Sequence, residues 1–331
     1  MESTSDMYVI VRHGSGPIQS IGASENRPML ARMSAGQSRL PQFLRDRALS
    51  VRLGGGIPVL LAHPDQGWNA PGAKPTPRPV VFWMHGRTAN KELDPGRYLR
   101  WLRAEGGGLS LCAIDLPGHG ERFDARLNSA ATWLEIIDQA VAEIDVILSA
   151  LAEPRWNGAF DTKRAAIGGM SMGGMVAIVR LCREHPFACA AVESTAGDFR
   201  LLGRGEKTFT AENAEDAETT ALPERSGPDT GGRRADSPWH GPVIPAENLP
   251  KWRPIPFLAL HSEADEMVPV GAMQSFIEAL QRHYTNVGAS PDLVRFITWP
   301  TTGAPREHLG FGQFSNEAKN LQTEFLARAL R

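Results

Sequence analysis

The sequence has few cysteines and no motif typical of a metal site. Only three of its 331 residues are cysteine, Cys112, Cys182 and Cys189, and their spacing is unlike that of metal ligands such as CxxC. Cys112 and Cys189 fall in predicted strands and Cys182 in a predicted helix, so all three are expected to be small buried hydrophobic residues. HExxH and clustered carboxylate motifs are also absent. The sequence therefore predicts no disulfide, no zinc site, no catalytic metal and no cofactor.

A strong net charge and a long apolar run are missing as well. The formal net charge is −2 and the isoelectric point is near 6.5, so we expect neither nucleic acid nor an anionic membrane surface as a partner. No uninterrupted apolar run approaches the ~20 residues that span a bilayer. Residues 1–6 lack the basic and then apolar layout of a signal peptide. These features predict a cytoplasmic protein with a small-molecule substrate, and they leave the oligomeric state open.

The most informative segment is the pentapeptide GMSMG at residues 169–173. It follows a short apolar run, residues 164–167, and opens a segment with apolar residues at helical spacing, residues 175–181. A GxSxG sequence between a strand and a helix is typical of a sharp turn that exposes the serine hydroxyl above the sheet. Ser171 is therefore the predicted nucleophile. The alternative is an ordinary turn in which Ser171 only caps the following helix.

A serine hydroxyl needs an acid and a base, because it is a poor nucleophile when unassisted. On this architecture the chain order is serine, then aspartate or glutamate, then histidine. Asp265 lies in the loop after the buried run 255–260. His308 lies in the loop after the β-rich run 293–299, just before the last helical segment. We expect His308 to be the general base and Asp265 to orient its imidazole ring.

Other residues compete for these two roles. Glu263, Glu266 and Asp198 are alternative acids, and the strand-then-loop context favours Asp265. The chain has nine histidines, and His308 is favoured because it lies on the last loop between a strand and a helix.

An oxyanion site is the remaining requirement, since a tetrahedral intermediate needs preorganised donors where its negative charge develops. An apolar run ends in a turn that begins with His85 and Gly86. Glycine lets this turn pass close to the nucleophile, and His85 is interpreted as a structural residue. We expect the backbone N–H groups of Met172 and Arg87 to be the donors, with Thr88 as the alternative to Arg87.

Together these pieces resemble the α/β-hydrolase superfamily, and they are most similar to the dienelactone hydrolase-like esterases and the catalytic domain of prolyl oligopeptidase-type enzymes. The resemblance covers roughly residues 47–331. It implies a mostly parallel eight-stranded sheet flanked by helices, and hydrolysis through an acyl-enzyme on Ser171. The matching segments are His85-Gly86-Arg87, Asp115 to Arg122, the serine turn, His261 to Pro269, and His308. Within the second segment, Asp115 and His119 are expected to shape a loop.

The chain departs from both relatives. Dienelactone hydrolases proper use a cysteine nucleophile, where this chain has Ser171. Only about 45 residues precede the first hydrolase strand, too few for the propeller of prolyl oligopeptidases. Small accessible esters are therefore favoured, and Met170 and Met172 beside the nucleophile favour short to medium acyl chains. A serine peptidase, thioesterase or acyltransferase on the same fold is the alternative, and a non-catalytic ligand-binding homologue is the alternative of another class.

The rest of the chain alternates predicted strands and helices. Residues 48–53 and 57–61 flank three glycines and predict an antiparallel hairpin. Residues 131–151 place apolar side chains on one face of a long helix. Such alternation is what a parallel sheet requires. We expect an α/β-hydrolase domain over residues 46–331 and an N-terminal extension over residues 1–45.

Two segments break this pattern. Residues 194–254, an insertion between the expected sixth and seventh strands, are polar and contain many glycines and prolines. They predict either a lid over the pocket or a surface excursion without substrate contact. In the lid hypothesis, Trp239 and Trp252 contact the ligand. Residues 8–14 resemble the RHG motif of histidine phosphatases, but such a domain needs on the order of 150 residues and does not fit before the hydrolase.

Overall fold

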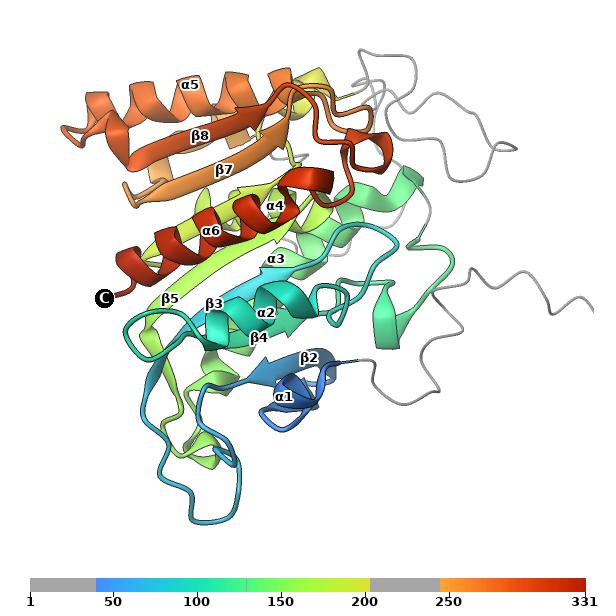
Figure 1. Ribbon diagram of the computed structural model, residues 1–331. Helices are drawn as coiled ribbons and strands as arrows, with labels where there is room; N and C mark the ends of the chain where they lie inside the picture. Colours follow the sequence, from blue (N-terminus) through green and yellow to red (C-terminus); the bar gives the residue numbers. More distant parts are fainter. Residues whose placement is uncertain (1–39, 129, 203–244) are drawn as a thin grey trace, which may run out of the picture.

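The fold is built on one eight-stranded sheet (Figure 1). The computed structural model describes residues 40–128, 130–202 and 245–331. The strands lie in the order β1-β2-β4-β3-β5-β6-β7-β8. Their bounds are β1 Ala48–Leu53, β2 Ile57–Ala62, β3 Arg78–Met84, β4 Ser110–Ile114, β5 Phe160–Met170, β6 Cys189–Glu193, β7 Phe257–Ser262 and β8 Val294–Trp299.

The sheet is mostly parallel, as the sequence predicts. β1 and β2 form the expected antiparallel hairpin, and β2 also pairs antiparallel with β4. All pairs from β4 through β8 are parallel. The interior strands β2, β4 and β6 are buried at every position, and their sequences are almost continuously apolar. This is the pattern of strands that are covered on both faces.

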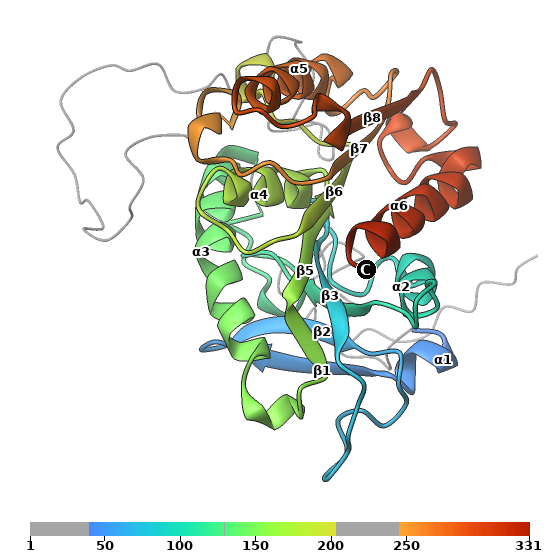
Figure 2. The ribbon, with the colours of Figure 1, turned by 90° about the vertical axis from the view of Figure 1, so that its left-hand side faces the viewer.

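Helices cover both faces of the sheet (Figure 2). α3, α4 and α5 lie on one face, and α1, α2 and α6 lie on the other. Each group packs into its own hydrophobic cluster with the sheet. The bounds are α1 Gln42–Arg45, α2 Pro95–Leu102, α3 Trp133–Leu151, α4 Met172–Leu181, α5 Val270–Asn286 and α6 Ser315–Ala329.

Helix α3 shows how the sequence pattern produces the packing. Its apolar stripe includes the buried residues Ile137, Val141 and Ile144, which face the core as expected. The three cysteines are buried too, as the sequence predicts. Within the described ranges, no helix combines the length and apolar character needed to cross a bilayer.

The long insertion lies between β6 and β7, as expected from the sequence. Its flanks, residues 194–202 and 245–256, are described. The predicted ligand contact Trp239 and the phosphatase-like segment 8–14 lie outside the described residues.

The topology gathers four loops at one edge of the sheet. β3, β5, β7 and β8 run parallel, so their carboxyl ends meet at the same edge. The turn at His85 follows β3, Ser171 follows β5, Asp265 follows β7 and His308 follows β8. Ligands of open α/β sheets bind in this region, outside the carboxyl ends of the strands.

Candidate active site

Ser171 stands at a sharp turn between β5 and α4. Its φ of 52° and ψ of −120° lie in a region that residues with a side chain rarely adopt. Three hydrogen bonds hold this backbone. The Ser171 N–H donates to the Glu193 carbonyl at 2.9 Å, and the Ser171 carbonyl accepts from Met175 N–H at 3.0 Å and from the Thr195 hydroxyl at 2.7 Å.

The two glycines of the pentapeptide are required by close packing. A Cβ atom at Gly173 would lie 2.2 Å from the Met84 carbonyl oxygen, and one at Gly169 would lie 2.4 Å from the backbone of Gly173. Within the described part of the chain, the Ser171 side chain makes no capping hydrogen bond to α4. The turn therefore presents the hydroxyl, and the interpretation of Ser171 as a mere helix cap is wrong.

Ser171, His308 and Asp265 form a continuous hydrogen-bonded chain. His308 Nε2 lies 3.0 Å from Ser171 Oγ, and His308 Nδ1 lies 2.8 Å from Asp265 Oδ2. His308 and Asp265 are buried, whereas Ser171 is half-buried. These distances are within hydrogen-bond reach of a nucleophile and its base, and of the base and its orienting acid. The structure thus brings together three residues that the sequence separates by up to 137 positions.

The carboxylate of Asp265 is fixed from both sides. Its Oδ1 accepts the backbone N–H groups of Met267 and Val268, each at 2.8 Å. His261 Nε2 lies 3.4 Å from Oδ2, on the side that also contacts His308. Burial by itself raises the pKa of Asp265, but the hydrogen bonds and charges of the two histidines outweigh it and lower the pKa below its ordinary value. Asp265 is therefore ionised and can stabilise a histidinium.

The competing acids have other partners. Glu263 accepts from the Thr298 hydroxyl, and Glu266 is exposed and faces Arg306 at 3.7 Å. Asp198 accepts from the side chains of Arg200 and Ser275.

The turn after β3 passes directly beside Ser171. A Cβ atom at Gly86 would lie 3.4 Å from the Cβ of Ser171. Met172 is the first residue of α4, where backbone N–H groups have no partner within the helix. The Arg87 guanidinium donates to the Asn128 carbonyl at 2.9 Å. Gly86 and Met172 thus place two segments with backbone donors next to Ser171.

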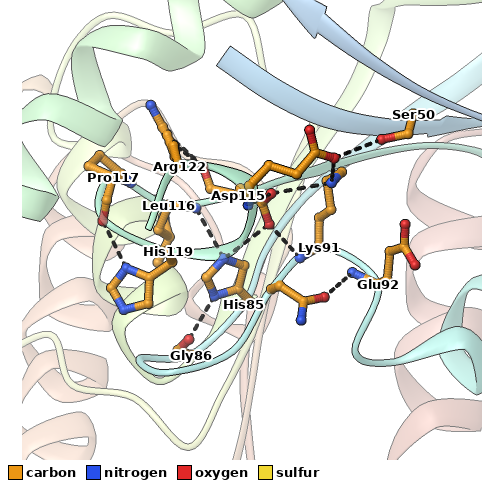
Figure 3. Close-up of polar contacts among 12 residues, drawn as sticks. Ser50, His85, Gly86, Lys91, Glu92, Asp115, Leu116, Pro117, His119 and Arg122 are labelled. Carbon is orange, nitrogen blue, oxygen red and sulfur yellow. Dashed lines mark hydrogen bonds and ion pairs between the residues drawn. The ribbon is translucent and has the colours of Figure 1, made fainter. Parts of the chain in front are cut away.

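A buried polar network holds this turn (Figure 3). His85 Nδ1 lies 2.7 Å from the Gly86 carbonyl oxygen, and its Nε2 accepts the Leu116 N–H at 3.0 Å. These partners assign the neutral tautomer with the proton on Nδ1. Burial and the nearby His119 lower the pKa of His85 to about 4. His85 therefore stays uncharged near neutral pH.

Asp115 is the centre of the network. Its buried carboxylate accepts from the Lys91 backbone N–H at 2.8 Å, from Lys91 Nζ at 3.2 Å and from the Glu121 N–H at 3.0 Å. His119 Nδ1 lies 2.8 Å from the Pro117 carbonyl oxygen. The two loops after β3 and β4 are joined in this way (Figure 3).

Two expectations about substrate contacts require correction. Trp252 is a core residue, with 2% of its surface exposed; its Nε1 donates to the Tyr284 hydroxyl at 3.1 Å and its ring packs against Phe257 and Phe276. It does not face a ligand, because the short segment before β7 turns it toward α5. The Met172 side chain is likewise buried against the core.

Thr88 and Met170, unlike Trp252, are not fully buried. Both are half-buried, and Met170 packs beside the turn at Gly86. Thr88 has a φ of 64°.

Sequence reasoning missed three residues around the site. Thr195 holds the Ser171 carbonyl, His261 contacts Asp265, and Glu307 accepts hydrogen bonds from both loops that carry the acid and the base. Glu307 had one local signal, since it directly precedes the predicted base. The other two lie at strand ends beside the site, which a motif search does not identify.

The chemistry of the arrangement is nucleophilic. A hydroxyl within hydrogen-bond distance of a histidine that is oriented by a carboxylate can attack a carbonyl carbon. Among the residues that the structure describes, no group of three His, Cys, Asp or Glu side chains is placed to hold a metal ion.

The fold and this constellation define a class of proteins in which a nucleophile follows the fifth strand of a parallel sheet. In agreement, residues 80–327 match the alpha/beta hydrolase family, and the chain belongs to this family.

Individual relatives share parts of this chain. The esterase YjfP of Escherichia coli is 34% identical over 150 residues, which are 45% of this chain and 55% of that protein. The chain thus spans about half the length of this curated relative. Among solved structures, the Pyrococcus furiosus esterase Pf2001 has a TM-score of 0.56 at 17% identity and covers 87% of this chain and 94% of its own. A puromycin-hydrolyzing peptidase of Mycobacterium tuberculosis has a TM-score of 0.56 at 20% identity, over 86% of this chain and 39% of its own.

Proposed function

We propose that this protein is a serine hydrolase that cleaves carboxylic esters of short to medium acyl chain through an acyl-enzyme on Ser171. The hydrogen-bonded chain from Ser171 Oγ through His308 to Asp265, with distances of 3.0 and 2.8 Å, carries the proposal. The similarity to a curated protein named as an esterase supports the ester as the substrate class.

The first half of the reaction forms the acyl-enzyme. Ser171 Oγ attacks the carbonyl carbon of the ester while His308 Nε2 takes the hydroxyl proton. Asp265, already ionised, stabilises the imidazolium that results. The negative charge of the tetrahedral intermediate develops beside the N–H groups of Met172 and Arg87, the proposed oxyanion donors. The intermediate then expels the alcohol, which receives the proton from His308.

The second half releases the acid. His308 Nε2 takes a proton from water, whose oxygen attacks the acyl carbon, and returns a proton to Ser171 Oγ as the ester bond to the enzyme breaks. Acyl transfer differs only in that another alcohol or an amine replaces water. The balance of atoms and charges is otherwise the same.

The size of the acyl group follows from the residues beside the nucleophile. Met172 is buried, so Met170, which is half-buried next to Gly86, is the elbow methionine available to the acyl chain. A flexible methionine restricts space and can still adapt its shape. Short and medium chains are therefore the expected optimum.

The test is hydrolysis of p-nitrophenyl esters from acetate to decanoate by the wild type and by Ser171→Ala. We expect activity to fall at least about a thousandfold in the variant, the scale seen when a triad nucleophile is removed. Ser275→Ala is a matched control, because this serine contacts Asp198 and lies on α5.

Fluorophosphonate labelling separates the alternatives. Labelling of Ser171 without ester turnover would favour a peptidase, thioesterase or acyltransferase. A wild-type protein that neither turns over esters nor reacts with the probe would favour a ligand-binding homologue and overturn the proposal.

A further inference from the structure

The histidine loop has an unusual backbone just before His308. Arg306 has a φ of 54° and Glu307 a φ of 52°, and neither residue is glycine. Residues with a Cβ atom avoid this left-handed region unless surrounding contacts hold them there. The direction in which His308 leaves the loop depends on this pair of residues. Surrounding contacts must therefore hold Arg306 and Glu307 in this conformation.

The Glu307 side chain supplies such a fixation. Its carboxylate accepts four hydrogen bonds: Oε2 from the Ser262 hydroxyl at 2.8 Å, from the Thr302 N–H at 2.5 Å and from the Thr302 hydroxyl at 2.7 Å, and Oε1 from the Gly303 N–H at 2.8 Å. The Thr302 hydroxyl and backbone donors lower the pKa of Glu307 to about 2. An ionised carboxylate is an acceptor at both oxygens, so it can serve all four donors at once.

The four donors come from two different loops. Thr302 and Gly303 begin the histidine loop after β8, whereas Ser262 ends β7, three residues before Asp265. A backbone hydrogen bond of 3.1 Å from the Glu266 N–H to the Arg306 carbonyl joins the same two loops. One carboxylate thus ties the loop of the acid to the loop of the base.

We infer that Glu307 is a positioning residue whose carboxylate clamps the acid and histidine loops together and so holds His308 against Ser171 and Asp265. The inference rests on the proposed function, since it assigns His308 as the base. Glu307 acts through the backbone of its neighbour and does not touch the reacting atoms. This role of Glu307 is specific to the histidine loop. The GxSxG pattern does not identify it.

Glu307→Gln tests the carboxylate with almost no change in volume. One oxygen becomes an NH₂ group, and in either orientation of the amide this group faces a backbone N–H, that of Thr302 or that of Gly303, and repels it. The loop should then relax from its strained backbone. We expect kcat to fall about ten- to a hundredfold, the cost of misplacing a catalytic group by about 1 Å, with KM little changed.

The matched control is Glu263→Gln. Glu263 lies in the same region, is exposed, and accepts one hydrogen bond at 2.7 Å from the Thr298 hydroxyl, which an amide oxygen can also accept. Ser262→Ala, a milder variant, removes one of the four donors and keeps the charge. It should lower kcat in the same direction by less, and it tests the clamp if Glu307→Gln does not fold.

Three measurements distinguish the clamp from the proposed function. Ester kinetics and fluorophosphonate labelling report Ser171, and the downfield proton NMR signal of the His308 Nδ1–H reports its hydrogen bond to Asp265 without requiring turnover. The clamp predicts slower labelling and loss or broadening of this signal in Glu307→Gln, with both unchanged in Glu263→Gln. An active wild type with an equally active Glu307→Gln that keeps the signal would overturn the clamp alone. An inactive, unlabelled wild type whose signal still disappears in Glu307→Gln would overturn the proposed function alone.

Discussion

At the scale of single residues, His85 controls a peptide that the proposed mechanism uses. Its Nδ1–H donates to the Gly86 carbonyl at 2.7 Å. In a trans peptide the carbonyl and the following N–H point in opposite directions. Fixing the Gly86 carbonyl therefore also fixes the direction of the Arg87 N–H, the proposed oxyanion donor. His85, interpreted from the sequence as structural, therefore orients a group that takes part in the proposed reaction.

His85→Phe should weaken catalysis without removing the nucleophile. The variant loses the donor to Gly86 and leaves the Leu116 N–H without its acceptor. We expect kcat to fall about ten- to a hundredfold, less than the loss of an oxyanion donor itself. Steady-state kinetics with a short p-nitrophenyl ester measure the effect.

His119→Phe is the comparison for this variant. Its Nδ1 lies 2.8 Å from the Pro117 carbonyl oxygen, and its ring, whose centroid is 5.5 Å from that of His85, donates no hydrogen bond to the Gly86 carbonyl. A smaller effect than that of His85→Phe is expected. Equal losses in the two variants would show that general damage to the network, and not the Gly86 peptide, lowers the rate.

At the scale of elements, a buried ion pair joins α2 to the end of β6. Arg97 donates to Glu193 at 2.5 Å, both side chains are 2% exposed, and the guanidinium lies 4.6 Å from the centre of the Trp83 ring. The backbone carbonyl of the same Glu193 accepts the Ser171 N–H. The ion pair thus anchors the strand end that supports Ser171, the proposed nucleophile.

Arg97→Met should destabilise the protein strongly. It leaves the Glu193 carboxylate buried without its charge partner, which costs about 3–5 kcal/mol of unfolding free energy. Urea unfolding followed by circular dichroism measures the change. Arg97→Met combined with Glu193→Leu removes both charges and should recover much of the loss. A single variant as stable as the wild type would show that the pair contributes nothing to stability.

Most elements of the fold could be predicted from the sequence, and their ends could not. The periodicity of residues 131–151 places α3 within two residues of its observed bounds. β5, expected from its apolar core at residues 164–167, extends over Phe160–Met170, because its polar first half pairs only briefly with β3 and carries no alternating pattern. Strand ends depend on pairing with a neighbour, which the local sequence does not encode.

The candidate site, like the fold, could be predicted only in part from the sequence. The GxSxG turn and the order of acid and base predict Ser171, Asp265 and His308, whose side chains the structure brings within hydrogen-bond distance, because these positions follow from where loops leave a parallel sheet. Trp252 was misjudged because an aromatic residue in a polar stretch has the same local pattern whether it faces a ligand or the core. Glu307 was missed because its role depends on Ser262, 45 residues away at the end of β7, and on a backbone conformation that the local sequence does not indicate.

At the scale of the whole molecule, several buried histidines make stability depend on pH. Burial and its neighbours lower the pKa of His85 to about 4, and burial with the nearby charges of Arg253 and Arg180 lowers that of His185 to about 4. In the unfolded chain both groups bind a proton as the pH falls below the ordinary histidine value of 6.5, whereas the folded protein resists this. The unfolding free energy should therefore decrease as the pH falls from 6.5 to about 4.

Thermal unfolding between pH 7 and pH 4 measures this slope in the wild type and in His185→Phe. His185 stacks on Phe187 away from the nucleophile, with the ring centroids 6.1 Å apart. A phenyl ring keeps the stacking and removes the titration, so the melting temperature of the variant should fall less steeply with acid. An identical slope in both proteins would assign the acid sensitivity to other groups.

The clamp should persist through this range, because the lowered pKa of Glu307 delays its protonation toward pH 2.

The strand order has a consequence for the biosynthesis of this chain. Ser171 is synthesised before its proposed base, which lies 137 residues later, beyond the last strand of the sheet. On the ribosome, the sheet can grow only as far as β6 until β7 and β8 emerge, and until then it has an open edge of the kind that chaperones protect. While these 137 residues are added, the nascent chain carries Ser171 without its proposed base. In the proposed mechanism, reactivity toward esters can begin only after translation has passed His308.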